Sequence, residues 1–207
     1  MARLSKPARK APAKPHARRS LEPVEKTDIA LARSVSLEDD GVAGKAIGKF
    51  AELGDQPPMQ LLCGVTIAAG AIRRDRRLFR VGLRMLAAHS LATLVKAFVK
   101  DGVDRTRPDD ALDSKRYKMQ AGDSDAHRLQ SMPSGHSAGT VAVAVSALPD
   151  YPQVAGPALV GSIAVLAAQL PSRNHYLTDV AVGSAIGLAA FGLAHLLLPP
   201  LDRPQSS

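Results

Sequence analysis

The amino-acid sequence predicts an all-α integral membrane protein, a bundle of about five transmembrane helices preceded by an interfacial helix. Between residues 131 and 199, only Asp150, Arg173 and Asp179 carry a formal charge. From residue 41 onward Ala, Leu and Gly dominate, and the strict alternation of a half-buried strand does not persist. Several of the apolar runs also lack a polar face, which is rare in soluble helical bundles.

Five apolar runs are the predicted spans, and they cover residues 57–72, 78–99, 137–149, 154–171 and 180–201. The last two reach the length of roughly 20 apolar residues that crosses a bilayer. The second run contains Arg80, Arg84 and Lys96, whose long side chains we expect to reach toward the membrane surface. A soluble bundle with buried core helices is the alternative, because the mean hydropathy of the chain is close to zero.

Two segments precede these runs. Residues 41–53 place Val42, Ile47, Phe50 and Leu53 against Lys45, Lys49 and Glu52, a pattern that predicts an interfacial helix or, alternatively, a soluble connector. Residues 1–40 carry nine Lys or Arg and six Asp or Glu, and residues 2–19 have almost nothing to bury. We therefore predict a disordered basic tail over residues 1–40 and a membrane-embedded domain over residues 41–207. The tail is either solvated or in contact with anionic lipid headgroups.

The composition excludes several classes of protein. Cys63 is the only cysteine, which rules out an intrachain disulfide and a multi-thiolate metal site. The chain has four Phe, three Tyr and no Trp, too few aromatic residues for a base-stacking surface, so we expect no nucleic-acid partner.

Polar residues gather in three short islands where the apolar runs stop, at residues 100–108, 131–136 and 171–179. The first follows the second run, the second precedes the third run, and the third lies between the last two runs. If all five runs span the membrane, the three islands lie on the same face. The polar segment 101–130 would then cover that face as a mobile lid or a substrate-entry element.

The islands hold groups suited to phosphate chemistry. Lys100 and Arg107 supply fixed positive charge, and Arg offers a planar fork of donors that matches phosphate oxygens. Ser134 can cap the helix that follows it, and the free N–H groups of a helix N-terminus bind anions. Gly135 lets the backbone approach such an anion closely.

Two histidines complete the set. His175 and Asp179 are four residues apart, on one face of a helical turn, as in an imidazole nucleophile or base held by a carboxylate. His136 is the second histidine. One histidine on each side of a phosphorus atom suits an in-line displacement, in which one attacks and the other protonates the leaving oxygen.

Together, Lys100-x6-Arg107-Pro108, Pro133-Ser134-Gly135-His136 and His175-x3-Asp179 resemble the three motifs of the type 2 phosphatidic acid phosphatase superfamily. That family includes membrane lipid phosphatases, acid phosphatases and vanadium haloperoxidases. The resemblance implies a hydrolase of phosphoesters or diphosphates that needs neither metal nor cofactor. It implies that His175 attacks phosphorus, that Asp179 orients His175 and that His136 protonates the leaving group. Lys100, Arg107, Ser134 and the Gly135 N–H would hold the phosphoryl oxygens.

The third motif departs from the family pattern, in which a Ser-Arg pair and five further residues precede the nucleophilic histidine. Ala168 and Gln169 stand at that place, and a Ser172-Arg173 pair lies closer to His175. Either Arg173 reaches the phosphate from a different point, or Gln169 supplies a weaker neutral contact.

A site at the level of the membrane surface predicts a lipid-borne phosphate substrate. Residues 73–80 hold five arginines, and the positive-inside rule places this loop in the cytoplasm. The site would then face outward from an inner or plasma membrane. Two alternatives remain: a magnesium-dependent prenyl-diphosphate enzyme that uses Asp109, Asp110 and Asp113, and a non-catalytic membrane protein that binds phospholipid headgroups.

Overall fold

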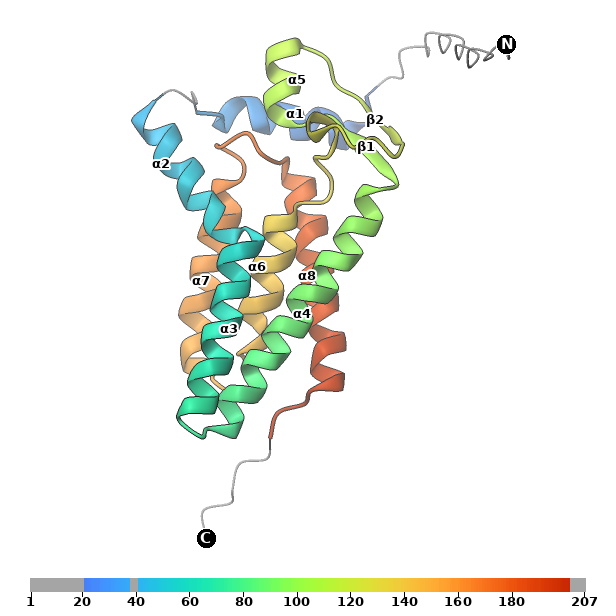
Figure 1. Cartoon of the computed structure of the whole chain (residues 1–207). Coiled ribbons are helices and arrows are strands. Elements are labelled where there is room, and N and C mark those ends of the chain that lie inside the picture. Colours follow the sequence, from blue (N-terminus) through green and yellow to red (C-terminus); the bar gives the residue numbers. More distant parts are fainter. Residues whose placement is uncertain (1–20, 38–40, 202–207) are drawn as a thin grey trace, which may run out of the picture.

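The structure, a computed structural model, describes residues 21–37 and 41–201. Five helices form the body of the molecule (Figure 1), namely α3 (Gln56–Ile72), α4 (Arg76–Lys100), α6 (Gly135–Ser146), α7 (Pro152–Ala168) and α8 (Leu177–Leu197). They fall on the five apolar runs, so the predicted all-α bundle is confirmed. Within the described ranges, α4 and α8 are long and apolar enough to cross a membrane, and α7 is a shorter apolar helix.

Local sequence explains where these helices begin. The Asp75 carboxylate accepts hydrogen bonds from the backbone N–H of Arg77 and Leu78 at 2.9 and 3.0 Å, which caps α4. Prolines stand in the first turn of α3 and α7, where a missing N–H costs nothing. Ser134 caps α6 by accepting from the Ser137 N–H at 3.3 Å.

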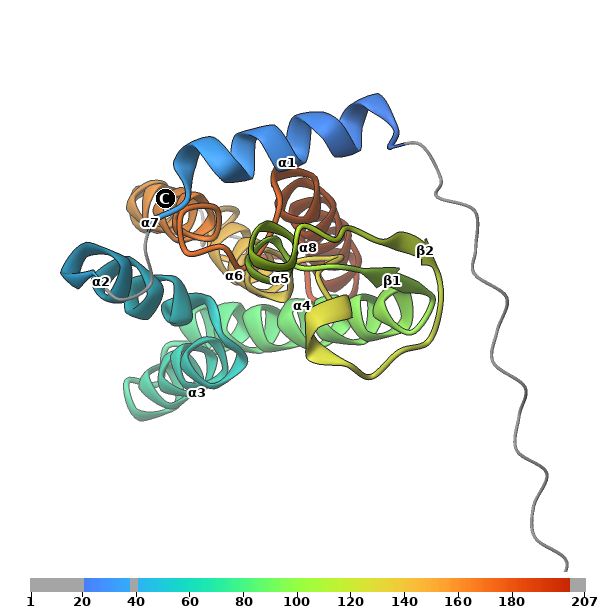
Figure 2. The same ribbon diagram turned by 90° about the horizontal axis from the view of Figure 1, so that it is seen from above.

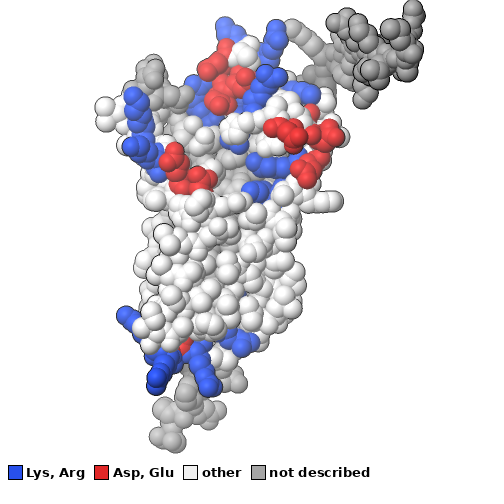
Figure 3. Space-filling view, in the orientation of Figure 1, with Lys and Arg blue, Asp and Glu red and all other residues white. Residues whose placement is uncertain are grey.

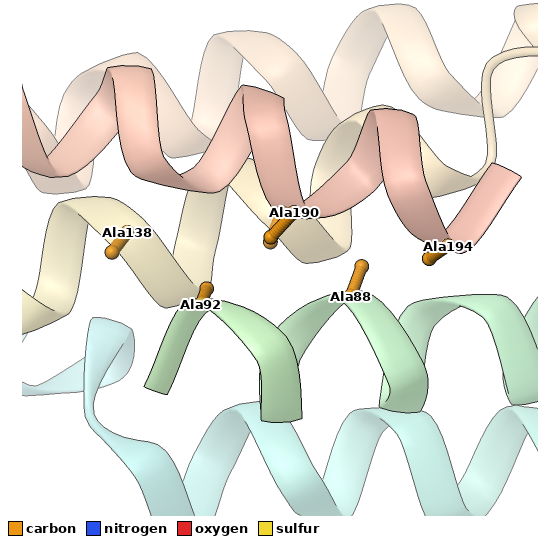
Figure 4. Close-up of a cluster of buried hydrophobic side chains, with 6 residues drawn as sticks. Ala88, Ala92, Ala138, Ala190 and Ala194 are labelled. Atoms are coloured by element: carbon orange, nitrogen blue, oxygen red, sulfur yellow. The ribbon is translucent and has the colours of Figure 1, made fainter. Parts of the chain in front are cut away.

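Small residues let α4, α6 and α8 pack closely. The buried cluster between them consists of alanines (Figure 4), namely Ala88, Ala92, Ala138, Ala142, Ala190 and Ala194. A Cβ atom on Gly183 would lie 2.4 Å from the Ser134 carbonyl oxygen, and one on Gly187 would lie 2.5 Å from that of Ala138. The backbones of α6 and α8 are therefore in direct contact, and the first turns of the two helices lie side by side.

The outer surface of the bundle is apolar. Large hydrophobic side chains are exposed on several helices, including Leu61, Val65, Leu94, Phe98, Val160, Ile163, Leu188 and Leu196. Figure 3 shows a broad belt without Lys, Arg, Asp or Glu, with charged side chains gathered above and below it. A continuous apolar surface of this kind faces lipid rather than water.

Arg84 ties the helices together at the end opposite the polar islands. It is fully buried, donates to the Ser146 carbonyl at 2.8 and 3.0 Å and to the Leu198 carbonyl at 3.1 Å, and pairs with Asp150. The expectation that Arg84 reaches toward the membrane surface is therefore wrong. Carbonyl groups at the ends of α6 and α8 satisfy the guanidinium inside the protein.

Two helices precede the bundle. The prediction of disorder over residues 1–40 is wrong for residues 21–37, which include α1 (Pro23–Val35); residues 1–20 and 38–40 lie outside the described ranges. Helix α1 buries Glu25, Asp28 and Ala32, contacts that the composition of the segment does not reveal. Seen from above (Figure 2), α1 crosses the end of α8 and runs toward the end of α7. Helix α2 (Val42–Ala51) and the 3₁₀ turn η1 (Glu52–Gly54) occupy the predicted interfacial segment.

Residues 101–130 form a folded cap over the end of the bundle that carries the polar islands. The cap contains strand β1 (Val103–Arg105), helix α5 (Pro108–Ser114), strand β2 (Met119–Ala121) and the 3₁₀ turn η2 (His127–Leu129). The two strands pair antiparallel, with Val103 opposite Ala121. The sequence predicts a mobile lid or a substrate-entry element here. In the structure Arg105 and Arg107 of the cap are buried, and backbone carbonyls of its last residues bind basic side chains of the site.

Candidate active site

A cavity of about 630 Å³ opens beneath the cap, and all three polar islands contribute to its wall. Its lining includes Lys96 and Lys100 of α4, Arg107 and His127 of the cap, Gly135 and His136 of α6, and Ser172, Asn174 and His175 of the α7–α8 connection. Gly44 and Gly48 of α2, together with Asp55, also line the cavity. Basic and histidine side chains from distant parts of the sequence thus face one space.

The His175 imidazole has one defined hydrogen-bond partner. Its Nδ1 lies 2.8 Å from the Ser131 carbonyl oxygen. A carbonyl oxygen can only accept, so Nδ1 carries the proton and Nε2 keeps its lone pair. Burial, reinforced by Arg107 and Lys100 and opposed by Asp179, lowers the pKa of His175 to about 4. At neutral pH His175 is therefore an uncharged imidazole with a free nucleophilic nitrogen.

Asp179 supports His175 through Ser131 rather than directly. Its Oδ2 lies 3.8 Å from His175 Nδ1, too far for a hydrogen bond. The same oxygen accepts from the Ser131 hydroxyl at 2.6 Å and from the Tyr176 N–H at 2.9 Å, while Oδ1 accepts from Arg105 at 2.5 Å. The carboxylate thus fixes the residue whose carbonyl holds the imidazole, a contact that the four-residue spacing does not predict.

The second histidine has an acidic partner that sequence reasoning missed. His136 Nε2 lies 2.7 Å from Asp55 Oδ1, and the ring centroids of His136 and His175 are 5.8 Å apart. Asp55 precedes α3, so only the folded chain brings it to the first turn of α6. Its side chain is about half exposed and lines the cavity. Burial, reinforced by Arg107, Lys100 and Lys96, lowers the pKa of His136, and the Asp55 carboxylate offsets part of this effect by favouring the protonated ring.

Three cations give the cavity its positive charge. Lys100 Nζ donates to the Gln130 carbonyl at 3.0 Å, and Arg107 Nε donates to the His127 carbonyl at 3.0 Å. Burial lowers the pKa of Arg107, because few anionic partners compensate for the lost water. Lys96, which the sequence presents only as a charge within an apolar run, is the third. An anion such as a phosphoryl group would satisfy these groups.

Two predicted phosphate-binding residues lie away from the cavity. Ser134 is fully buried, and its hydroxyl oxygen is used by the N–H and hydroxyl of Ser137. Arg173 adopts a left-handed backbone conformation with φ of 58°, and its guanidinium contacts the Asp109 carbonyl at 3.0 Å and the Asp113 carboxylate. Gly135 does line the cavity, where a side chain would collide with Lys96.

The acidic motif on α5, which consists of Asp109, Asp110 and Asp113, takes part in contacts within the protein. Asp113 pairs with Arg173, and the Asp109 carboxylate accepts from the Asp110 N–H at 2.7 Å. Within residues 21–37 and 41–201, no group of three or more His, Cys, Asp or Glu side chains is placed to hold a metal ion.

Gln169, at the place of the family arginine, is also outside the cavity wall. It is fully buried, and its side-chain amide donates to the Ala51 carbonyl at the end of α2 at 3.2 Å. Its backbone carbonyl accepts from the His175 N–H at 3.3 Å. Gln169 therefore links α2 to the α7–α8 connection, and neither its side chain nor that of Arg173 lines the cavity.

Comparisons with known proteins agree with the fold and with the motifs. A family model of the PAP2 superfamily matches residues 81–202. A crystal structure described as the first transmembrane PAP2 type phosphatidylglycerolphosphate phosphatase from Bacillus subtilis is similar, with a TM-score of 0.64 and 24% sequence identity over 84% of this chain and 85% of that chain. No curated protein matched. Because the family model spans more than half of the chain and all three polar islands, the chain belongs to the PAP2 superfamily, and its fold is that of a transmembrane member.

Proposed function

We propose that this protein is a membrane lipid phosphatase that hydrolyses a phosphoester or diphosphate through a histidine nucleophile, without a metal ion. One observation carries the proposal. His175 presents a free Nε2, because the Ser131 carbonyl fixes its Nδ1 proton. The centroids of the His136 and His175 rings are 5.8 Å apart. Lys100 and Arg107 line the same cavity and supply the charge that a phosphoryl group requires.

The first step transfers the phosphoryl group to the enzyme. Lys100, Arg107 and the N–H of Gly135 hold the phosphoryl oxygens. His175 Nε2 attacks phosphorus, an N–P bond forms, and the bond between phosphorus and the leaving oxygen breaks. His136 gives its proton to that oxygen, so the leaving group departs as a neutral alcohol, or as a protonated phosphate when the substrate is a diphosphate.

The second step releases the phosphate. His136, now neutral, takes a proton from a water molecule as the water attacks phosphorus. The N–P bond breaks, its electron pair returns to Nε2, and inorganic phosphate leaves. Asp179 and Ser131 hold His175 in place in both steps, and Asp55 stabilises the protonated form of His136.

The position of the cavity favours a substrate carried by a lipid. It opens at one end of an apolar bundle, next to α2, where nothing lies within 4 Å of a Cβ atom built on Gly48. The arginine-rich turn between α3 and α4 lies at the opposite end (Figure 1). The positive-inside rule assigns that turn to the cytoplasm, so the active site would face outward from the inner or plasma membrane. Labelling a Ser124→Cys variant in intact cells with an impermeant maleimide tests this orientation, and absence of labelling would contradict it.

Phosphate release tests the proposed reaction. Detergent-solubilised wild-type protein is incubated with a panel of lipid phosphates in the presence of EDTA and compared with His175→Ala. We expect release from at least one lipid and a loss of roughly 10³-fold or more in the variant. His195→Ala, which removes a histidine at the far end of α8, is the control and should remain active. Activity that EDTA abolishes would favour the magnesium-dependent alternative, and unchanged activity in His175→Ala would exclude the histidine mechanism.

A further inference from the structure

Helix α1 lies outside the matched residues 81–202, yet it buries a carboxylate next to the active site. Asp28 is 3% exposed, and its Oδ2 accepts from Arg105 Nη2 at 2.7 Å. Its Oδ1 accepts from the Thr178 N–H at 3.3 Å, and the Thr178 hydroxyl also donates to the carboxylate. Asp28 therefore binds both the cap and the first turn of α8, and these are the two elements that meet beside His175.

Arg105 is shared between two buried carboxylates. Its Nη2 binds Asp28, and its Nη1 binds Asp179 Oδ1 at 2.5 Å. Its Nε donates to the Tyr117 hydroxyl at 3.0 Å, and its guanidinium lies 4.3 Å from the ring centroid of Tyr176. Burial opposes the charge on this group, but Asp179 and Asp28 offset it, so the pKa of Arg105 is raised. The guanidinium is a fixed cation with an acceptor on each side.

The contacts continue to the nucleophile. Asp179 Oδ2 accepts from the Ser131 hydroxyl at 2.6 Å, and the Ser131 carbonyl accepts from His175 Nδ1 at 2.8 Å. The links from Asp28 to Ser131 are charged or charge-assisted hydrogen bonds, and the last one, to His175, is a neutral hydrogen bond. All of these groups are at most 3% exposed, so water has little access to replace a missing partner. If Asp28 lost its charge, Arg105 would keep Asp179 as its only carboxylate and would draw that group away from Ser131.

We propose that Asp28 of α1 is a positioning residue for His175, acting through Arg105, Asp179 and Ser131. The inference rests on the proposed phosphatase function. It makes α1, a helix that precedes the matched domain, part of the active site. Because Lys100 and Arg107 do not take part in this chain of contacts, loss of Asp28 should slow the transfer step much more than it weakens substrate binding.

Kinetics of Asp28→Asn in the full-length protein test this inference. We expect kcat to fall by roughly 10- to 100-fold, the cost of a misplaced reacting group, while KM changes by less than about 3-fold. Asp28→Glu restores the carboxylate and should recover part of the loss. Asp123→Asn makes the same chemical change at an exposed position of the cap and should behave as wild type.

A second arm separates positioning from general stability. In an Asp179→Asn background, where the chain of contacts is already broken, adding Asp28→Asn should change kcat by less than about 2-fold. Thr178→Val is a milder variant in case Asp28→Asn does not fold, and it should lower kcat by about 5-fold. Multiplicative effects of the two substitutions, or an Asp28→Asn enzyme with wild-type kcat, would overturn the inference. A wild-type protein that releases no phosphate from any lipid would instead reject the proposed function.

Discussion

His175 and His136 have different environments although their rings are neighbours. His175 is buried, held by the Ser131 carbonyl, and has its pKa lowered to about 4. His136 is partly exposed to the cavity and binds the Asp55 carboxylate. Burial also lowers the pKa of His136, but the Asp55 carboxylate offsets part of that effect. A neutral ring with a free nitrogen suits a nucleophile, and a carboxylate partner suits a proton donor. The two proposed roles therefore rest on the partners of each ring and not on the histidines alone.

The protonation state of His175 can be observed directly. Ring NMR signals of the detergent-solubilised protein, assigned with a His175→Gln variant, should keep their neutral values as the pH falls from 8 to about 5, because the proton is taken up only near pH 4. An ordinary exposed histidine titrates near pH 6.5. A His175 midpoint at that ordinary value would show that burial does not suppress its charge.

The effect of Asp55 on kcat should depend on how much protonation the leaving group needs. Asp55→Asn keeps an acceptor near His136 but removes the charge that favours the protonated imidazole. We expect kcat to fall by about 10-fold for a lipid alcohol leaving group, which needs a proton. For a nitrophenyl phosphate, whose leaving group needs little protonation, the effect should be below about 2-fold. Steady-state rates with both substrates make the comparison, and Asp125→Asn serves as an exposed control. Equal losses on both substrates would contradict the assigned role of His136.

At the level of elements, the contact between α6 and α8 fixes the site. Gly183 lies against the Ser134 carbonyl, and the Ser134 N–H donates to the Asp179 carbonyl at 3.1 Å. Because the two backbones touch there, the first turn of α6, which carries His136, is held against the turn that follows His175. This backbone contact thereby keeps the spacing between the first turns of the two helices constant.

Gly183→Ala should disturb this contact. The added methyl group would lie 2.4 Å from a backbone oxygen, so the helices must separate, at a cost of about 1–3 kcal/mol. Gly192→Ala is the matched control on the same helix, because nothing lies within 4 Å of its added Cβ atom. Thermal unfolding in detergent and phosphate release measure the two effects. Equal behaviour of the two variants would show that close helix contact does not hold the site.

At the level of the whole molecule, the two ends of the bundle differ in function. One end holds the cavity, the cap and α1, and the other is tied by Arg84. Charged side chains lie at both ends of the face seen in Figure 3, with an apolar belt between them. The arrangement places the polar cavity at one end of helices whose outer surface is apolar.

Arg84→Leu tests the buried contacts of Arg84 at the end of the bundle opposite the cavity. The substitution leaves Asp150 buried without its fully buried partner and removes the guanidinium from the Ser146 and Leu198 carbonyls. We expect the free energy of unfolding to fall by about 3 kcal/mol. Arg76→Gln, which changes an exposed arginine at the same end, should be close to neutral. Unfolding in detergent provides the measurement, and an Arg84→Leu protein as stable as wild type would show that the Arg84 contacts do not stabilise the bundle.

The sequence predicts the features that depend on neighbouring residues, but it does not predict contacts between residues that are far apart in the chain. Apolar runs predict α3, α4, α6, α7 and α8 because lipid selects uninterrupted apolar segments. Motifs at matching helix ends predict that Lys100, Arg107, His136 and His175 line one cavity. Asp28 could not be predicted, because its partner Arg105 is 77 positions away and nothing near Asp28 indicates burial. The direction of Arg173 depends on a left-handed turn that its sequence does not specify.

In the proposed reaction His175 forms a covalent bond to phosphorus, and trapping that intermediate tests the mechanism most directly. Wild-type protein is mixed with a lipid phosphate labelled on the phosphoryl group, quenched within one turnover under alkaline conditions that preserve phosphohistidine, and digested for mass spectrometry. We expect the phosphoryl group on His175 with EDTA present, and no labelled protein with His175→Ala. Rapid phosphate release without any labelled enzyme, or a label on a different residue, would contradict the account.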